Sequence, residues 1–129
     1  TCMHIGDSRA YHYKAGRLTQ MTEDHTLVNI LYKNGVIRKD ELKSHPQRNV
    51  LMKSITATEQ VEADTFQLEL GAGEFMLLCS DGLTEQMTRK QLEKFFEQDE
   101  EPGVIGEKLV DEALRLGGRD NIAVVVIRG

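Results

Sequence analysis

The stretch Phe75-Met-Leu-Leu-Cys79-Ser-Asp81-Gly-Leu83 places a carboxylate shortly after an unbroken apolar run. Such a run, preceded by the turn-forming Gly71-Ala-Gly73, is typical of a strand that is buried on both faces of a sheet. A carboxylate beside so apolar a strand is costly to bury unless a cation or a hydrogen-bond donor satisfies it. We therefore expect a buried strand over 75–80, with a polar site at its C-terminal end.

Two helices are predicted after this strand. Thr88 and Gln91 have the spacing of a capping box, which favours a helix over 89–97. A second helix begins near Gly103 and ends at Gly117-Gly118. Its apolar stripe predicts a buried face formed by Ile105, Leu109, Ala113 and Leu116.

The β-branched run Ile122–Ile127 predicts a last strand, which Asp120 precedes. The two helices between this run and the strand over 75–80 give ample chain for a return in the antiparallel direction. Asp81 follows one strand and Asp120 precedes the other, so an antiparallel pairing brings both residues to adjoining strand ends. Their carboxylates can therefore share a site only if the two strands run antiparallel.

The chain before the apolar run begins with short strands. Cys2–Ile5 predicts a strand that ends at the polar cluster Gly6-Asp7-Ser8-Arg9. Segments 10–14 and 17–20 flank Ala15-Gly16 and predict a hairpin with a tight turn. The first of the candidate carboxylates, Asp7, therefore also lies where a strand meets a turn.

A polar segment over 24–49 separates the hairpin from the next strand. It predicts a short helix from about Thr26, another over 39–44, and little core. Alternating apolar residues over 61–70 then predict half-buried extended chain with a change of register. Together these elements indicate an α+β fold with mainly antiparallel strands and helices packed on a sheet.

Composition limits the function classes. A chain of 129 residues, 40% hydrophobic and 29% charged, is expected to form one globular domain. The net charge of −5 argues against a nucleic-acid binder and against an anionic lipid surface, and no run is long enough to span a membrane. Two cysteines cannot form a disulfide framework, so a reducing, cytoplasmic location is expected. Because the chain begins without Met and almost at once enters a strand, it is interpreted as a fragment.

Three aspartates, Asp7, Asp81 and Asp120, stand where a predicted strand meets a turn. Carboxylates that converge at strand ends suit hard divalent cations such as Mg²⁺ or Mn²⁺, which prefer oxygen ligands. Asp-Gly and Arg-Asp-Asn are also ordinary turn sequences. The local pattern leaves both interpretations open.

Five motifs in order separate the two interpretations. They are Gly6-Asp7-Ser8-Arg9, Thr22-Glu-Asp24-His25, His45-Pro-Gln-Arg-Asn49, Leu78-Cys-Ser-Asp-Gly-Leu83 and Gly117-Gly-Arg-Asp-Asn121. Each alone is weak, but the ordered set is specific. With these motifs, the chain from Gly6 to Ile127 resembles the second half of a metal-dependent serine/threonine protein phosphatase of type 2C, the PPM family, in a bacterial style.

The resemblance implies part of an α-β-β-α sandwich with a binuclear Mg²⁺ or Mn²⁺ centre. Asp81 and Asp120 match the family's metal ligands, and Asp7 matches a carboxylate near a third, more weakly held metal. The metals would activate a water for in-line attack on phosphorus, without a phosphoenzyme. The segment 24–49 matches the family's flap beside the active site. The expected substrates are phosphoserine and phosphothreonine proteins, the products of a serine/threonine kinase.

The chain also departs from the family pattern. The phosphate-binding arginine and the Asp-Gly-His-Gly-Gly type segment of the family's N-terminal half have no match, and Asp81-Gly-Leu83 is not that segment. No catalytic general acid is therefore assigned within 1–129, and the chain is expected to carry only part of the site. Because sheet strands of that half are missing too, we expect the chain to self-associate or to need its N-terminal half.

Other phosphatase chemistries do not fit. A cysteine phosphatase built on Cys79 would need arginine where Glu85 stands, so Cys79 is predicted to be a buried apolar residue. A phosphoaspartate mechanism fails because glycine and leucine follow Asp81. We predict that Arg9 pairs with a carboxylate rather than with phosphate, and that His25 closes the turn 22–26. The alternative from another class is a non-catalytic binding module that uses the flap as its surface.

Overall fold

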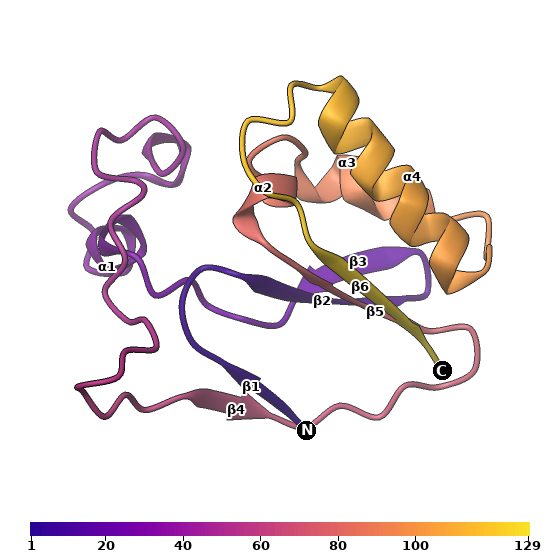
Figure 1. Ribbon diagram of the computed structural model, residues 1–129, viewed down its shortest axis with the longest axis horizontal. Coiled ribbons are helices and arrows are strands. Elements are labelled where there is room, and N and C mark those ends of the chain that lie inside the picture. The colour runs from indigo at the N-terminus through magenta and orange to yellow at the C-terminus, as the bar shows by residue number, and fades with distance from the viewer.

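An antiparallel sheet of four strands forms the centre of the computed structural model, which describes residues 1–129 (Figure 1). In spatial order the strands are β3 (Arg17–Gln20), β2 (Arg9–Lys14), β5 (Phe75–Cys79) and β6 (Val124–Arg128). β5 and β6 run antiparallel, with Cys79 opposite Val124. This pairing confirms the predicted direction of the last strand and places the end of β5 beside the start of β6.

The β2–β3 hairpin turns at Ala15 and Gly16, as the sequence predicts. Both residues have positive φ, 49° and 78°, which is the backbone twist that a two-residue hairpin turn requires. Glycine adopts this conformation without a steric cost. The local turn chemistry thus fixes the register of the first two strands of the sheet.

Helices cover one face of this sheet (Figure 1). They are α2 (Asp81–Thr84), α3 (Arg89–Glu93), the 3₁₀ helix η2 (Lys94–Phe96) and α4 (Pro102–Arg115). The predicted capping box is present: the Gln91 N–H donates to Thr88 Oγ1, and the Thr88 N–H donates to Gln91 Oε1. The single helix predicted over 89–97 is instead an α-helical part followed by a 3₁₀ part.

α4 packs on the sheet through the stripe that the sequence indicates. Ile105, Leu109 and Ala113 are completely buried. Leu116 was also expected in this stripe, but it is 36% exposed because α4 ends at Arg115 and Leu116 is the C-cap residue. None of the helices has the combination of length and apolar character needed to cross a membrane.

The core lies between this face of the sheet and the helices. Its largest fully buried side chains are Tyr11, Leu18, Phe75, Leu77, Leu83, Leu92, Phe96, Ile105 and Leu109. Tyr13, Phe75 and Phe96 form an aromatic cluster, in which the Phe96 ring centroid lies 5.4 Å from that of Tyr13 and 5.6 Å from that of Phe75. Such spacing is favourable for aromatic rings, so α3, η2 and the sheet are held together at this point.

A second, two-stranded sheet lies on the other side of the molecule. β1 (Cys2–His4) pairs antiparallel with β4 (Asp64–Phe66), and His4 lies opposite Asp64. The extended chain predicted over 61–70 is therefore a strand only at 64–66. The physical reason is pairing, because β1 offers β4 a partner of only three residues.

The segment 24–49 lies at one side of the molecule, away from α3 and α4 (Figure 1). Its first helix is α1 (Leu27–Lys33), which begins at the N-cap Thr26, whose Oγ1 accepts the Asn29 N–H. The helix predicted over 39–44 is a single 3₁₀ turn, η1 (Lys39–Glu41). As predicted, this segment adds little to the core, since only Val28 within α1 is buried.

Candidate metal centre

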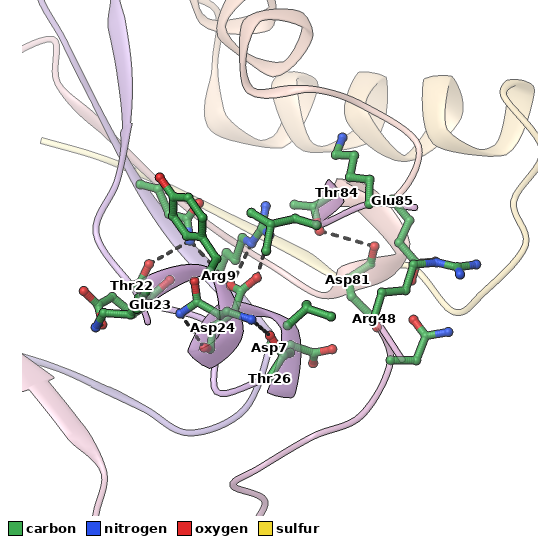
Figure 2. A pocket seen from close by; sticks show the side chains of 18 of the residues that line it. Asp7, Arg9, Thr22, Glu23, Asp24, Thr26, Arg48, Asp81, Thr84 and Glu85 are labelled. Carbon is green, nitrogen blue, oxygen red and sulfur yellow. Dashed lines mark hydrogen bonds and ion pairs between the residues drawn. The ribbon is translucent and has the colours of Figure 1, made fainter. Parts of the chain in front are cut away.

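A cavity of about 740 Å³ lies between one end of the four-stranded sheet and the segment 24–49. Figure 2 shows Asp81 and Thr84 of α2 on one side of it, with Asp7 and Asp24 on the other. The residues that line it come from four separate parts of the chain: 7–9, 20–49, 81–86 and Arg119. The sheet end, the turn after β1 and the segment 24–49 meet only in the folded molecule.

Asp7 and Asp81 are brought together in this cavity. Asp7 lies in the turn between β1 and β2, and Asp81 begins α2 directly after β5. Burial raises the pKa of the Asp7 carboxyl, and the negative charge of Asp81 with a hydrogen bond between the two side chains raises it further. The two carboxyl groups thus repel each other when both are ionised.

This pair fits a hard divalent cation. Its donors are carboxylate oxygens, which Mg²⁺ and Mn²⁺ prefer. Arg9 lines the same cavity, but its guanidinium is occupied by Asp24 and does not neutralise the pair. A cation between Asp7 and Asp81 would remove the repulsion that raises the pKa of Asp7.

Asp120 lies at the same end of the sheet, in the turn before β6. The end of β5 is fixed to this turn: Ser80 Oγ donates to Asn121 O at 3.3 Å and accepts the Ala123 N–H at 3.0 Å. Gly82 packs so closely on the Asn121 backbone that a Cβ would overlap with it. The Asp120 carboxylate itself accepts the Asn121 N–H at 2.7 Å, and Asp120 is not among the residues that line the cavity.

Arg9 pairs with a carboxylate, as predicted. Its Nε and Nη2 donate to the two oxygens of Asp24 at 2.9 and 2.6 Å, and its Nη1 donates to the Tyr11 hydroxyl. Burial alone would lower the pKa of Arg9, but the hydrogen bonds to Asp24 hold it above its ordinary value. This bidentate pair joins the start of the segment 24–49 to the beginning of β2.

His25 has a structural role, but not within the turn 22–26 where it was expected. Its Nδ1 accepts the Gly6 N–H at 3.0 Å, and its Nε2 lies 2.6 Å from Asp64 Oδ2. His25 therefore joins the turn that carries Asp7 to β4. Sequence reasoning did not identify Asp64, because the two residues are 39 positions apart and Asp64 belongs to no motif.

Cys79 is buried, as predicted, with 4% of its surface exposed. Burial raises the pKa of its thiol to about 12. A thiol with such a pKa is almost entirely protonated at neutral pH, and the thiolate is the nucleophilic form. The burial and the raised pKa of this thiol agree with the interpretation of Cys79 as a buried apolar residue.

Comparison with known proteins identifies relatives over nearly the whole chain. A family model described as Stage II sporulation protein E (SpoIIE) matches residues 2–129. The serine/threonine protein phosphatase PstP of Mycobacterium tuberculosis is 42% identical over 124 residues, which are 96% of this chain and 24% of PstP. The serine/threonine phosphatase stp of Listeria monocytogenes is 34% identical over 96% of this chain and 49% of its own length. The chain thus spans half, or less, of these curated relatives.

Solved structures agree with this result. A crystal structure of the M. tuberculosis phosphatase PstP/Ppp superimposes with a TM-score of 0.89 at 40% identity, covering 96% of this chain and 52% of that one. The S. agalactiae serine/threonine phosphatase gives a TM-score of 0.91 at 33% identity, and the match covers 98% of this chain and 53% of that one. A third neighbour is the PstP catalytic domain in complex with two manganese ions. It has a TM-score of 0.83 at 38% identity, and the match covers 96% of this chain and 50% of that one.

Proposed function

The chain belongs to the SpoIIE/PP2C-type family of PPM phosphatases, and we propose that it forms part of the catalytic domain of an enzyme that hydrolyses phosphoserine and phosphothreonine in proteins. The observation that carries the proposal is that Asp7 and Asp81 line the same polar cavity beside the flap segment, where the charge of Asp81 helps to raise the pKa of Asp7. The α+β arrangement of antiparallel sheets and helices is that of the PPM structures.

The metal ligands in this proposal are Asp81, Asp120 and Asp7. Asp81 and Asp120 contribute to a binuclear Mn²⁺ or Mg²⁺ centre, and Asp7 with Asp81 contributes to a third, weaker site. The position of Asp7 and Asp81 in one cavity, and the adjoining strand ends that carry Asp81 and Asp120, support this assignment. When bound, the cations would supply charge neutralisation and an acidified water for attack on phosphorus.

The residues of this chain hold and enclose the site. Asp24 and Arg9 fix the start of the flap, whose residues 24–49 form one wall of the cavity and restrict access to it. The phosphate-binding arginine and the general acid come from outside 1–129 in this scheme. The partners in this proposal are phosphorylated proteins produced by a serine/threonine kinase, and the proposed location is the cytoplasm.

The proposal is tested by replacing single carboxylates in the full-length protein. Asp81→Asn and Asp120→Asn keep the size of the side chain but remove a negative charge from the metal ligands, and hard-cation affinity depends on that charge. Each variant is expected to bind Mn²⁺ more weakly in calorimetric titration. Phosphate release from a phosphothreonine peptide should fall about 100-fold or more, since metal catalysis supplies several kcal/mol. Asp7→Asn should reduce turnover with less effect on the tighter metals.

A matched control is Asp111→Asn on the exposed surface of α4, which should leave both measurements unchanged. In chelator, the melting temperature of the Asp7 and Asp81 variants should stay the same or rise, because one of two repelling carboxylates is removed. Unchanged activity in the Asp81 and Asp120 variants would contradict the binuclear site. It would favour the alternative of a non-catalytic binding module.

A further inference from the structure

Gly6, the residue before Asp7, is held by two hydrogen bonds to one partner. The backbone N–H of His25 donates to Gly6 O at 2.9 Å, and the Gly6 N–H donates to His25 Nδ1 at 3.0 Å. Both polar groups of the Gly6 backbone are therefore committed to His25. Since Gly6 is bonded directly to Asp7, the position of His25 determines the position of the Asp7 backbone.

The backbone of Gly6 would not be fixed without such a partner. Its φ is +104°, which lies in the region that side-chain-bearing residues rarely adopt, and glycine loses more conformational freedom on ordering than any other residue. Two hydrogen bonds to a side chain and a backbone from another segment offset that loss. The conformation of the turn that carries Asp7 therefore depends on His25.

Asp64 is the partner of the other nitrogen of the His25 ring. Because the Gly6 N–H points at Nδ1, that nitrogen keeps its lone pair, and a neutral ring carries its proton on Nε2. Nε2 lies 2.6 Å from Asp64 Oδ2, so it donates to this carboxylate. The same hydrogen bond lowers the pKa of Asp64. A carboxylate that accepts from one ring nitrogen selects the tautomer and the orientation of the ring.

His4 covers a face of the His25 ring. The two rings stack with centroids 4.8 Å apart, and His4 is only 7% exposed with no hydrogen-bond partner on either nitrogen. His4 and Asp64 lie opposite each other in the β1–β4 pair, so the short second sheet delivers both to His25. The ring is thereby restrained from its face and from its edge.

A metal ion is the competing occupant of this cluster, because donor atoms of His4, His25 and Asp64 lie within 4.8 Å of one another. The hydrogen bond from Gly6 argues against it. A cation bound to His25 Nε2 would use the lone pair of Nε2. Because Nδ1 already uses its own lone pair to accept the Gly6 N–H, the imidazole would then carry no proton on either nitrogen. The cluster is therefore better explained as a hydrogen-bonded pair packed against His4.

We propose that Asp64 is a positioning residue that acts through His25 on the Gly6–Asp7 turn and thereby sets the geometry of the metal ligand Asp7. The inference rests on the proposed function, since it takes Asp7 to be a ligand of the weaker metal site. It assigns to the β1–β4 sheet a role in the metal centre, although neither strand lines the cavity.

The test compares Asp64→Ala, Asp64→Asn and the matched control Glu62→Ala in the full-length protein. Glu62 is exposed on the same segment and has no hydrogen bond or ion pair. Asp64→Ala removes the acceptor and should weaken Mn²⁺ binding at the weakest site about 10-fold, as loss of a supporting partner does in metal sites. The tighter metals should keep their affinity, and the loss of turnover should be recovered at higher Mn²⁺ concentration.

The conservative variant and the ring itself give readouts that a merely structural role would not change. Asp64→Asn retains a carbonyl that accepts the Nε2 proton, so it should recover most of the Mn²⁺ affinity that Asp64→Ala loses. Nitrogen-15 NMR of the His25 ring should show the proton on Nε2 in the unsubstituted protein and a mixture of tautomers in Asp64→Ala. Glu62→Ala should match the unsubstituted protein in every measurement.

Three results would overturn the inference. One is an unchanged Mn²⁺ titration in Asp64→Ala. Another is equal weakening of all metal sites together with a lower melting temperature in chelator, which would indicate general destabilisation. The last is Zn²⁺ binding, in a titration with Zn²⁺ alone, that is lost in both Asp64→Ala and His4→Ala. Asp7→Asn distinguishes failure of the proposed ligand set from failure of the inference about Asp64. If Asp7→Asn leaves the weakest Mn²⁺ site intact, the proposed ligand set is wrong, whatever the result for Asp64.

Discussion

The two faces of the four-stranded sheet differ in composition and in what covers them. On the face toward α3 and α4, Phe75, Leu77 and Cys79 of β5 are at most 4% exposed. On the other face, Met76 of β5 is 9% exposed, but Val125 and Ile127 of the edge strand β6 are 53% and 41% exposed. Successive side chains of a strand point to opposite faces of the sheet, so one apolar run supplies apolar side chains to both faces. An apolar run thus predicts a strand that can be buried on both faces. Which of its residues are buried in this chain depends on the elements that pack against each face.

The largest effect is expected from the covered face. Leu77 is completely buried in the core cluster, and Leu77→Ala should lower the free energy of unfolding by about 2–5 kcal/mol, through lost burial and the cavity left behind. Val125→Ala is the matched change on the other face and should cost less than about 1 kcal/mol in the 129-residue chain. Denaturant unfolding of both variants provides the measurement. Equal losses would show that the two faces are packed alike.

A smaller effect on stability, but a clear effect on association, is expected from the open face. Val125→Ser combined with Ile127→Ser removes exposed apolar surface on β6, a strand at the edge of the sheet. Exposed apolar patches and open strand edges promote association. The 129-residue chain is expected to self-associate in sedimentation velocity, and the double variant to do so less. A monodisperse monomer before substitution would instead indicate a self-sufficient domain.

The smallest effect concerns the polar end of the open face. Glu74 accepts hydrogen bonds from Lys14, from His12 and from the Gly71 N–H, and these lower its pKa from 4.5 to about 2. Because the folded-state pKa lies below the ordinary value, the contribution of Glu74 to stability is complete above pH 4.5. It is lost as the pH falls toward 2.

Glu74→Gln should therefore lower the melting temperature slightly at neutral pH, and the difference from the unsubstituted chain should shrink between pH 4.5 and 2. Thermal unfolding monitored across this pH range gives the answer. The matched control Glu69→Gln, on the exposed chain before the same turn, should show no such convergence. A difference that persists at pH 2 would mean that the carboxylate charge is not what stabilises this end of the sheet.

The sequence by itself determined the elements whose signals are local. The capping box at Thr88 and Gln91, the turn at Ala15-Gly16 and the apolar run of β5 each depend on residues that are close in the chain, and all three are present in the structure. The placement of Asp81 directly after β5 is local too. A strand, a cap or a turn depends on neighbouring residues, so their order along the chain is sufficient to predict it.

Only the tertiary structure decided which distant residues meet. The position of Asp7 and Asp81 in one cavity depends on how β2 and β5 pair, and the bond between His25 and Asp64 depends on the β1–β4 pair. The extended chain over 61–70 shows the same limit, because it is a strand only where β1 pairs with it. Strand register and the packing of separate segments are long-range properties, and no local pattern in Asp64 or its neighbours specifies them.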